Sequence, residues 1–197
     1  MHCPSAGIIL RRTLGSRYKI ALLDKQHGRM EAISHSSTLM VGSLITYTLS
    51  EQQRGNYFLQ DSQLLYVPLS LGRADLLFFH HVLELIYYFA AVGSCVSGVF
   101  DLLAFLYTTE HMLMSVQFKK FFLLKLLTLM GATPELASVR TPGMDRLSVM
   151  ATNQFDAIVI DTVTEKELDR WLWSCIWQHP YVNEFKTVHF LEQNRTI

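Results

Sequence analysis

The fold of this chain depends on residues 122–136, which read Phe-Leu-Leu-Lys-Leu-Leu-Thr-Leu-Met-Gly-Ala-Thr-Pro-Glu-Leu. Up to Gly131 the stretch is apolar on nearly every face of a helix, with Lys125 as its only charge. A helix that is hydrophobic on all sides belongs in a protein core. Gly131 and Pro134 provide a stop signal at its end. The stretch therefore predicts the central helix of a helical domain, on which the flanking helices pack.

Helical spacing of apolar residues predicts further helices on both sides of this one. The expected helices, the central one included, span residues 75–91, 100–107, 112–130 and 164–178. The last begins with Thr164-Glu165-Lys166-Glu167, which has the pattern of a capping box. Between helices, the sixteen uncharged residues 85–100 fall short of the roughly 20 that a membrane span needs. The tail, residues 185–191, is apolar enough to dock on the core.

Before Pro68 the sequence has the two-residue alternation of β-strands. The expected strands span residues 7–14, 17–24, 29–34, 44–49 and 57–67. Lys25-Gln26-His27-Gly28 is typical of a hairpin turn in which the glycine takes the left-handed conformation. Five short strands within about 70 residues favour a small closed barrel. We therefore expect an α+β, multidomain chain with a barrel domain in residues 1–70 and an all-helical domain in residues 71–197.

Composition and charge limit the function classes. Half of the 197 residues are hydrophobic, and 17 basic residues balance 17 acidic ones, which excludes a global positive field that attracts nucleic acid. Residues 1–70 nevertheless hold seven Lys or Arg against four Asp or Glu. The three cysteines are widely spaced, which favours a reducing, cytoplasmic compartment. The apolar run before Arg11 is too short for the core of a signal peptide.

Six basic side chains fall on three adjacent predicted strands and their turns, and they form the first candidate site. They are Arg11, Arg12, Arg17, Lys19, Lys25 and Arg29. Such a group on a small barrel can follow a nucleic-acid backbone, while Tyr18, Tyr47 or Tyr57 offers a stacking surface. Arg17 and Lys19 share a strand face, because side chains two residues apart point the same way, so this pair is the first candidate for phosphate contact. The alternative is that all six are ordinary solvated strand positions.

A second candidate site lies at the start of the central helix, where Lys119 and Lys120 precede Phe122 and Lys125. Together they would flank an apolar groove that receives a partner's acidic, hydrophobic-ended tail. The lysines would attract the carboxylates, and a phenylalanine such as Phe122 would receive the terminal ring. The alternative is that these lysines merely extend from a buried helix into solvent.

No arrangement of residues favours catalysis. The sequence contains no Gly-rich phosphate loop, nucleophile elbow or Cys–His pair at a useful spacing, so we expect no enzymatic activity, catalytic residue or cofactor. His80 and Glu84 lie one helical turn apart but lack the third and fourth ligands that zinc needs. The acidic residues between Asp156 and Asp169 favour a solvated helix N-terminus over a hydrolytic metal site, which stays the least favoured alternative.

Three segments, spread along almost the whole chain, together carry a family resemblance. The first runs from Gly7-Ile8-Ile9-Leu10-Arg11 through Tyr18-Lys19-Ile20 to His27-Gly28. The second is the central stretch, with the pattern Phe-x-Leu-Lys-Leu-Leu-x-x-x-Gly-x-x-Pro-x-Leu. The third includes Glu184-Phe185-Lys186-Thr187. In this order they resemble the first barrel strands, the most recognisable helix and the closing segment of the RecO family of bacterial recombination mediators.

The resemblance implies an OB fold for residues 1–70 and a non-enzymatic mediator of DNA repair and homologous recombination. Such a protein binds single- and double-stranded DNA, promotes strand annealing and helps to load recombinase together with its partner RecR. The C-terminal tail of the single-strand DNA-binding protein would dock near Lys119 and Lys120. The protein would be cytoplasmic and nucleoid-associated. The alternative is a RecO-like scaffold that has kept protein contacts and lost DNA binding.

The chain departs from the family pattern after the central helix. Many members carry a four-cysteine zinc site after the Pro-x-Leu segment, whereas residues 137–160 contain no cysteine or histidine. Zinc sites of this kind need four such ligands. We therefore expect residues 135–160 to be an irregular, degenerate zinc-site region that binds no metal.

Overall fold

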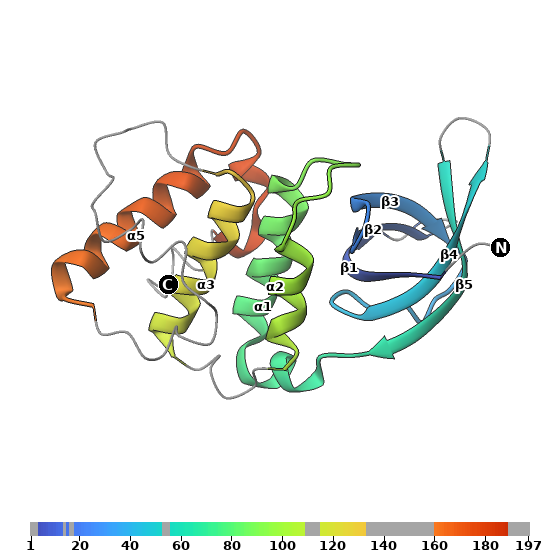
Figure 1. Cartoon of the computed structure of the whole chain (residues 1–197), viewed down its shortest axis with the longest axis horizontal. Helices are drawn as coiled ribbons and strands as arrows, with labels where there is room; N and C mark the ends of the chain where they lie inside the picture. The colour runs from blue at the N-terminus through green and yellow to red at the C-terminus, as the bar shows by residue number, and fades with distance from the viewer. Residues whose placement is uncertain are drawn as a thin grey trace.

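The computed structural model describes residues 4–13, 15, 18–52, 56–108, 115–132 and 160–188, with the strands preceding the helices (Figure 1). The strands are β1 (Ser5–Thr13), β2 (Tyr18–Asp24), β3 (Gly28–Ser34), β4 (Leu44–Gln52) and β5 (Asn56–Tyr66). The helices are α1 (Leu69–Phe89), α2 (Val99–Leu106), α3 (Val116–Leu129), α5 (Thr162–Trp177) and the short 3₁₀ helix η4 (Val182–Glu184).

The five strands close into a barrel in the order β1-β2-β3-β5-β4. The pairs are antiparallel except for β3 and β5, which run parallel. Inward side chains form one hydrophobic cluster, which includes Ile9, Ile20, Leu22 and Ile45. The predicted closed barrel followed by helices is confirmed, and the chain is α+β. Strand β4 runs a few residues past its predicted end because it pairs with β5 as far as Gln52.

A β-bulge at Leu10 decides what the two faces of β1 contact. Ile9 pairs with Leu22 and Arg11 pairs with Ala21, so Leu10 is an extra residue between consecutive pairs. Ile9 lies inside the barrel, whereas Leu10 joins the cluster that the barrel shares with the helices. The extra residue shifts the alternation, so Arg11 also lies on the outer face, beside Ala21.

The barrel and the helices share one hydrophobic core. Four outward side chains of β1 and β2 belong to the same hydrophobic cluster as the helices. They are Ile8, Leu10, Ala21 and Leu23. The β2–β3 hairpin also touches the turn after α1. A Cβ atom at Gly28 would lie 2.0 Å from the Ser94 carbonyl oxygen, and Gly28 has a φ of +74°, so only glycine permits this approach. The predicted division into two domains at residue 70 stays a prediction.

Helix α1 bends at Asp75, where the backbone leaves the helical conformation. The Asp75 carboxylate accepts a hydrogen bond from the backbone N of Phe78 at 3.0 Å and so caps the longer part of the helix. That part corresponds to the predicted helix 75–91, and α2 corresponds to the predicted helix 100–107. Within the described part of the chain, no helix is long and apolar enough to cross a membrane.

Helix α3 is the predicted central helix, and Figure 1 shows it between the α1–α2 pair and α5. Eight of its fourteen side chains are buried, and Val116 is the only exposed one in the helix. At its end Gly131 has a φ of +72°, its N–H donates to the Thr128 carbonyl at 3.0 Å, and the Ala132 N–H donates to the Leu127 carbonyl at 2.9 Å. These two bonds form a Schellman motif. The predicted stop at Gly131 is confirmed, while Pro134 lies outside the described residues.

Helix α5 begins at Thr162 because Asp161 caps it. The Asp161 carboxylate accepts hydrogen bonds from the backbone N of Val163 at 2.9 Å and of Thr164 at 2.8 Å. The capping box predicted at Thr164 is therefore wrong, because the free amides of the helix lie earlier in the chain. The predicted end of this helix is confirmed. The predicted irregular region, residues 135–160, lies outside the described residues apart from its last residue.

The segment after η4 docks against α1. Phe185 and Val188 are buried in the core, as predicted for this tail. The Glu84 carboxylate accepts hydrogen bonds from the backbone N of Lys186 at 2.8 Å and of Thr187 at 2.9 Å, and from the Thr187 hydroxyl at 2.5 Å. Glu84 is thus engaged in this contact, and the described residues contain no group of three or more potential metal ligands.

His81 lies buried beside this contact, with Nδ1 2.8 Å from the Thr187 hydroxyl oxygen. The single hydroxyl proton of Thr187 goes to Glu84, which only accepts, so Nδ1 of His81 carries the imidazole proton. The other ring nitrogen, Nε2, is buried without a hydrogen-bond partner among the described residues. Burial lowers the pKa of His81 to about 4.

Acidification should destabilise the fold through His81. In the unfolded chain the imidazole has a pKa of about 6.5. As the pH falls, the unfolded state therefore takes up a proton before the folded state does. The contribution of His81 to stability is complete above that pH and is lost as the pH approaches the folded pKa of about 4. Between pH 7 and pH 5 we expect its share of the free energy of unfolding to fall by about 2 kcal/mol.

Urea unfolding of the wild type and of His81→Gln at both pH values measures this share. Glutamine gains no proton, so the pH dependence of the variant should be smaller by this amount. The other titratable groups are the same in both proteins, so their contributions cancel in the comparison. Equal pH dependence in the two proteins would contradict the prediction.

Candidate nucleic-acid interface

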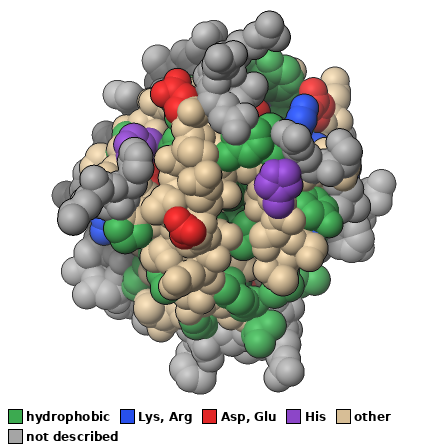
Figure 2. Space-filling model, turned by 90° about the vertical axis from the view of Figure 1, so that its right-hand side faces the viewer, with side chains coloured by type: hydrophobic (Ala, Val, Ile, Leu, Met, Phe, Trp, Pro, Cys, Tyr) green, Lys and Arg blue, Asp and Glu red, His purple; other side chains and the backbone are tan. Residues whose placement is uncertain are grey.

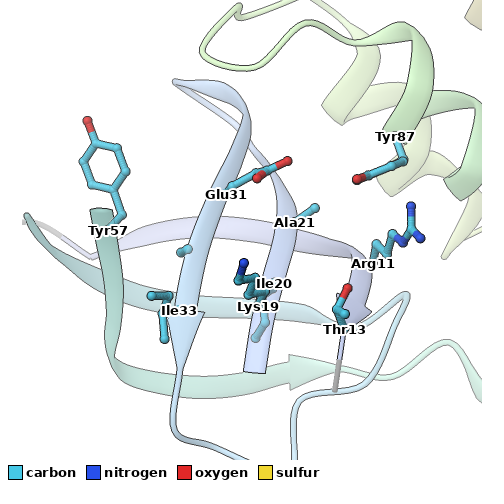
Figure 3. A pocket seen from close by; sticks show the side chains of 10 residues that line it. Arg11, Thr13, Lys19, Ile20, Ala21, Glu31, Ile33, Tyr57 and Tyr87 are labelled. Atoms are coloured by element: carbon cyan, nitrogen blue, oxygen red, sulfur yellow. The ribbon is translucent and has the colours of Figure 1, made fainter. Parts of the chain in front are cut away.

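A hollow of about 360 Å³ lies on the outer face of the barrel (Figure 3). Its lining comes from β1, β2, β3 and β5 and from one residue of α1, and consists of Arg11, Thr13, Lys19, Ile20, Ala21, Glu31, Ala32, Ile33, Tyr57 and Tyr87. In Figure 3 Tyr57 stands at one end, Arg11 and Tyr87 stand at the other, and Lys19 lies between them. The hollow is thus a strip across the strands with an aromatic ring at each end.

Cross-strand pairing explains which side chains meet in this hollow. Arg11 pairs with Ala21, and Ala21 pairs with Glu31, so the three residues form one row across β1, β2 and β3. Paired residues project from the same face of a sheet, and so does Lys19, two residues before Ala21 on β2. Because Ala21 is small, the row leaves a depression between Arg11 and Glu31.

Two of the six predicted basic residues line the hollow. Arg11 and Lys19 are exposed, and neither forms an ion pair within the described part of the chain. The Arg11 guanidinium carbon lies 4.9 Å from the ring centroid of Tyr87, and its Nη1 lies 3.4 Å from the Tyr88 hydroxyl. Arg17 lies outside the described residues, so its predicted pairing with Lys19 stays a prediction.

Two others have contacts elsewhere on the barrel. Nη1 of Arg12 donates to the backbone carbonyls of Ser37 and Leu39, both at 3.0 Å, and so fastens the loop after β3. Lys25, in the hairpin turn, forms an ion pair with Asp101 of α2 at 3.2 Å. Both side chains of this ion pair are largely exposed, so it contributes little to stability.

Arg29 fastens β3 to the end of α1. Its Nη1 donates to the backbone carbonyls of Tyr87 and of Ala90, the latter at 3.3 Å, and its Nη2 lies 2.9 Å from Glu31 Oε1. The guanidinium carbon lies 4.2 Å from the ring centroid of Tyr87. The last carbonyls of a helix lack partners within the helix, and a cation there also complements the helix dipole. The same arginine neutralises Glu31, the carboxylate that lines the hollow.

The predicted stacking tyrosines differ in exposure. Tyr57 is half-buried and lines the hollow. Tyr18 is covered by the guanidinium of Arg12, 4.0 Å from its ring centroid. Tyr47 is fully buried inside the barrel, so the prediction that it offers a stacking surface is wrong. Tyr87 was not predicted from the sequence, because it comes from α1 and reaches the hollow only through the packing of α1 on the barrel.

Among the described residues, few basic side chains lie on the end of the barrel remote from the helices. Figure 2 views this end, and the described Lys and Arg side chains lie only at its margins. Hydrophobic side chains and polar atoms cover most of the described surface there. The described residues at this end of the barrel therefore offer few cations to phosphates.

The predicted partner-binding residues of α3 have contacts within the chain. Lys119 forms an ion pair with the capping carboxylate at the bend of α1, and Lys120 forms ion pairs with two carboxylates of α5. Phe122 is fully buried in the core, and Lys125 is half-buried. The binding of a partner's tail by these residues stays a prediction.

Comparison with known proteins does not identify a family for this chain. No protein-family model matches the chain, and neither does any curated protein. The function is therefore inferred from the sequence and from the geometry of the hollow.

Proposed function

We propose that this protein binds single-stranded nucleic acid on the outer face of its barrel and acts as a RecO-like mediator of DNA repair and recombination. The five-stranded closed barrel fits an OB fold, in which the face of strands 2 and 3 binds oligonucleotides. The hollow on this face, with Lys19 and Arg11 free of ion pairs among the described residues, is the observation that carries the proposal.

The chemistry of binding is electrostatic and requires no covalent step. Lys19 and Arg11 neutralise phosphates, and the ring of Tyr57 stacks on a base. Phosphate contacts carry no sequence information, and stacking tolerates any base, so we expect little sequence preference. Double-stranded DNA would meet the same cations through its backbone.

The mediator role rests on the resemblance of three segments to the RecO family. The proposed partners are RecR, the recombinase that is loaded, and the C-terminal tail of the single-strand DNA-binding protein. For the tail to bind at α3, Lys119 and Lys120 would exchange their carboxylate partners within the chain for those of the tail.

Lys19→Gln should weaken the binding of single-stranded DNA by about eightfold at 50 mM salt and about threefold at 200 mM salt. Each phosphate contact on a single strand contributes about −0.7 to the slope of log affinity against log salt. With about 1 M salt as the reference at which the contact contributes nothing, this slope gives the two factors for one lost contact. Fluorescence anisotropy with labelled oligothymidylate at the two salt concentrations measures the change.

Lys166→Gln is the matched control for this experiment. Lys166 is an exposed lysine of α5, the helix farthest from the barrel in Figure 1. Its replacement removes the same charge and should leave the affinity unchanged. Equal affinities for the wild type and both variants would contradict the proposed interface.

A scaffold without DNA affinity is the second candidate function. It is favoured by the observation that Arg12, Lys25 and Arg29 are engaged in contacts within the chain, which leaves fewer cations for phosphates. Weak binding of the wild type that does not change with salt would support this candidate, because phosphate contacts always release counterions.

A further inference from the structure

A second hollow, of about 260 Å³, begins at the end of the first one. It lies between β1, α1 and the segment after η4, and its basic and aromatic members are Arg11, Arg12, His80, Tyr87, Tyr88 and Lys186. Arg11 and Tyr87 line both hollows. The two hollows therefore adjoin at Arg11 and Tyr87, the first on β2 and β3 of the barrel and the second against the helices.

Cations free of ion pairs among the described residues line both hollows. Lys19 lines the first hollow, Arg11 lines both, and Lys186 lines the second. None of the three forms an ion pair within the described residues. The carboxylates that line the two hollows are engaged, since Glu31 pairs with an arginine of its own strand and Glu84 accepts three hydrogen bonds from the C-terminal segment.

The two hollows keep a fixed position relative to each other, because hydrogen bonds fasten the barrel to the helices. The Arg29 side chain bonds to the last carbonyls of α1, and the Arg29 carbonyl accepts a hydrogen bond from the N–H of Gly93 at 2.7 Å. The buried hydroxyl of Tyr107, next to α2, donates to the Gly42 carbonyl at 2.8 Å. The two hollows therefore keep the same position relative to each other.

We propose that a single nucleic-acid strand continues from the barrel face into this second hollow, where Lys186 contacts a phosphate beyond those held by Lys19 and Arg11. This inference rests on the proposed function. Exposed cations that alternate with tyrosine rings are the arrangement that follows a single strand. Tyr88, which is half-buried, also lines the second hollow, with its ring centroid 4.9 Å from that of Tyr87. The Lys186 backbone N bonds to Glu84, so the residue is anchored while its side chain is exposed.

Oligothymidylates of about 4 to 16 nucleotides, the range of site sizes for an OB fold, test this path. A short strand reaches only the first hollow, so Lys186→Gln should leave its affinity unchanged. For the longest strand, Lys186→Gln should reduce the affinity by about eightfold at 50 mM salt and about threefold at 200 mM salt. Lys19→Gln should reduce the affinity at every length.

Two controls accompany this experiment, and two results would contradict the proposal. Lys166→Gln is again the control for the loss of a lysine, and thermal unfolding of each variant verifies that the fold is kept. If Lys186→Gln binds every length like the wild type while Lys19→Gln binds more weakly, the path is overturned and the proposed function stands. If the wild type binds no oligothymidylate of any length, both are overturned.

Discussion

Lys120→Ala should lower the free energy of unfolding by about 3 kcal/mol, the lower end of the range for a broken buried ion pair. The Lys120 side chain is 5% exposed, and its Nζ lies 2.8 Å from Glu165 Oε1 and 2.9 Å from Asp169 Oδ2. Burial alone would lower the pKa of Lys120, but hydrogen bonds to Asp169 and Glu165 outweigh burial and raise it, so the ammonium stays charged. Alanine would leave two carboxylates facing each other at the contact of α3 with α5.

The expected loss for Lys120→Ala is at the lower end of the range for a broken buried ion pair, because the two carboxylates are partly exposed and solvent screens their repulsion. Urea unfolding at pH 7 measures the change. A triple variant, Lys120→Met with Glu165→Gln and Asp169→Asn, removes all three charges and should recover most of the loss. Lys166→Ala, at an exposed position of α5, is the control for the loss of a lysine. A loss below about 1 kcal/mol in Lys120→Ala, the value for an exposed pair, would contradict the prediction.

The position of Lys120 illustrates what the sequence can and cannot predict. The apolar stretch 122–136 predicts a buried helix because nearly every face of that helix is apolar, and Gly131 predicts its end because the stop signal is local. The same pattern does not indicate whether a lysine before the stretch faces solvent, a partner protein or another helix. The carboxylates that bind Lys120 lie 45 and 49 residues away, and only the packing of α5 brings them close.

The barrel and its hollow show the same difference between features that local sequence signals predict and features that arise only from packing. Two-residue alternation and the glycine of the hairpin turn are local signals, so the strands could be predicted to within a few residues. The hollow could not, because Tyr87 arrives with α1. Strict alternation from Ile9, which lies inside the barrel, would also put Arg11 inside; the bulge at Leu10 puts it on the outer face. No feature of the sequence indicates that bulge.

Asp24→Ala should lower the free energy of unfolding by about 3–4 kcal/mol. The carboxylate is buried, with Oδ1 accepting hydrogen bonds from the backbone N of Gln26 at 2.8 Å and of His27 at 2.7 Å. Oδ2 accepts a hydrogen bond from the Tyr47 hydroxyl at 2.5 Å inside the barrel. Each bond to a charged group contributes about 1.5–3 kcal/mol, and a buried hydroxyl left without a partner costs about 1–3 kcal/mol. The bonds share one carboxylate, so their contributions do not add in full.

A double-mutant cycle with Tyr47→Phe separates these contributions. Phenylalanine removes the hydroxyl, so Asp24→Ala in the Tyr47→Phe protein should cost about 1–3 kcal/mol less than in the wild type. Urea unfolding of the four proteins gives the coupling free energy directly. Additive losses would contradict the buried contact between Asp24 and Tyr47.

The effect of Asp24 should extend beyond the barrel, because the turn that it holds leads into Gly28, which touches Ser94 after α1. Asp24→Asn keeps an oxygen that can accept from the turn amides, whereas Asp24→Ala releases them. We therefore expect amide hydrogen exchange at Gly93, whose N–H bonds to the Arg29 carbonyl, to accelerate in Asp24→Ala and much less in Asp24→Asn. Equal exchange in both variants and the wild type would confine the role of Asp24 to the barrel interior. Faster exchange in Asp24→Ala alone would show that one buried carboxylate also holds the contact between the barrel and the turn after α1.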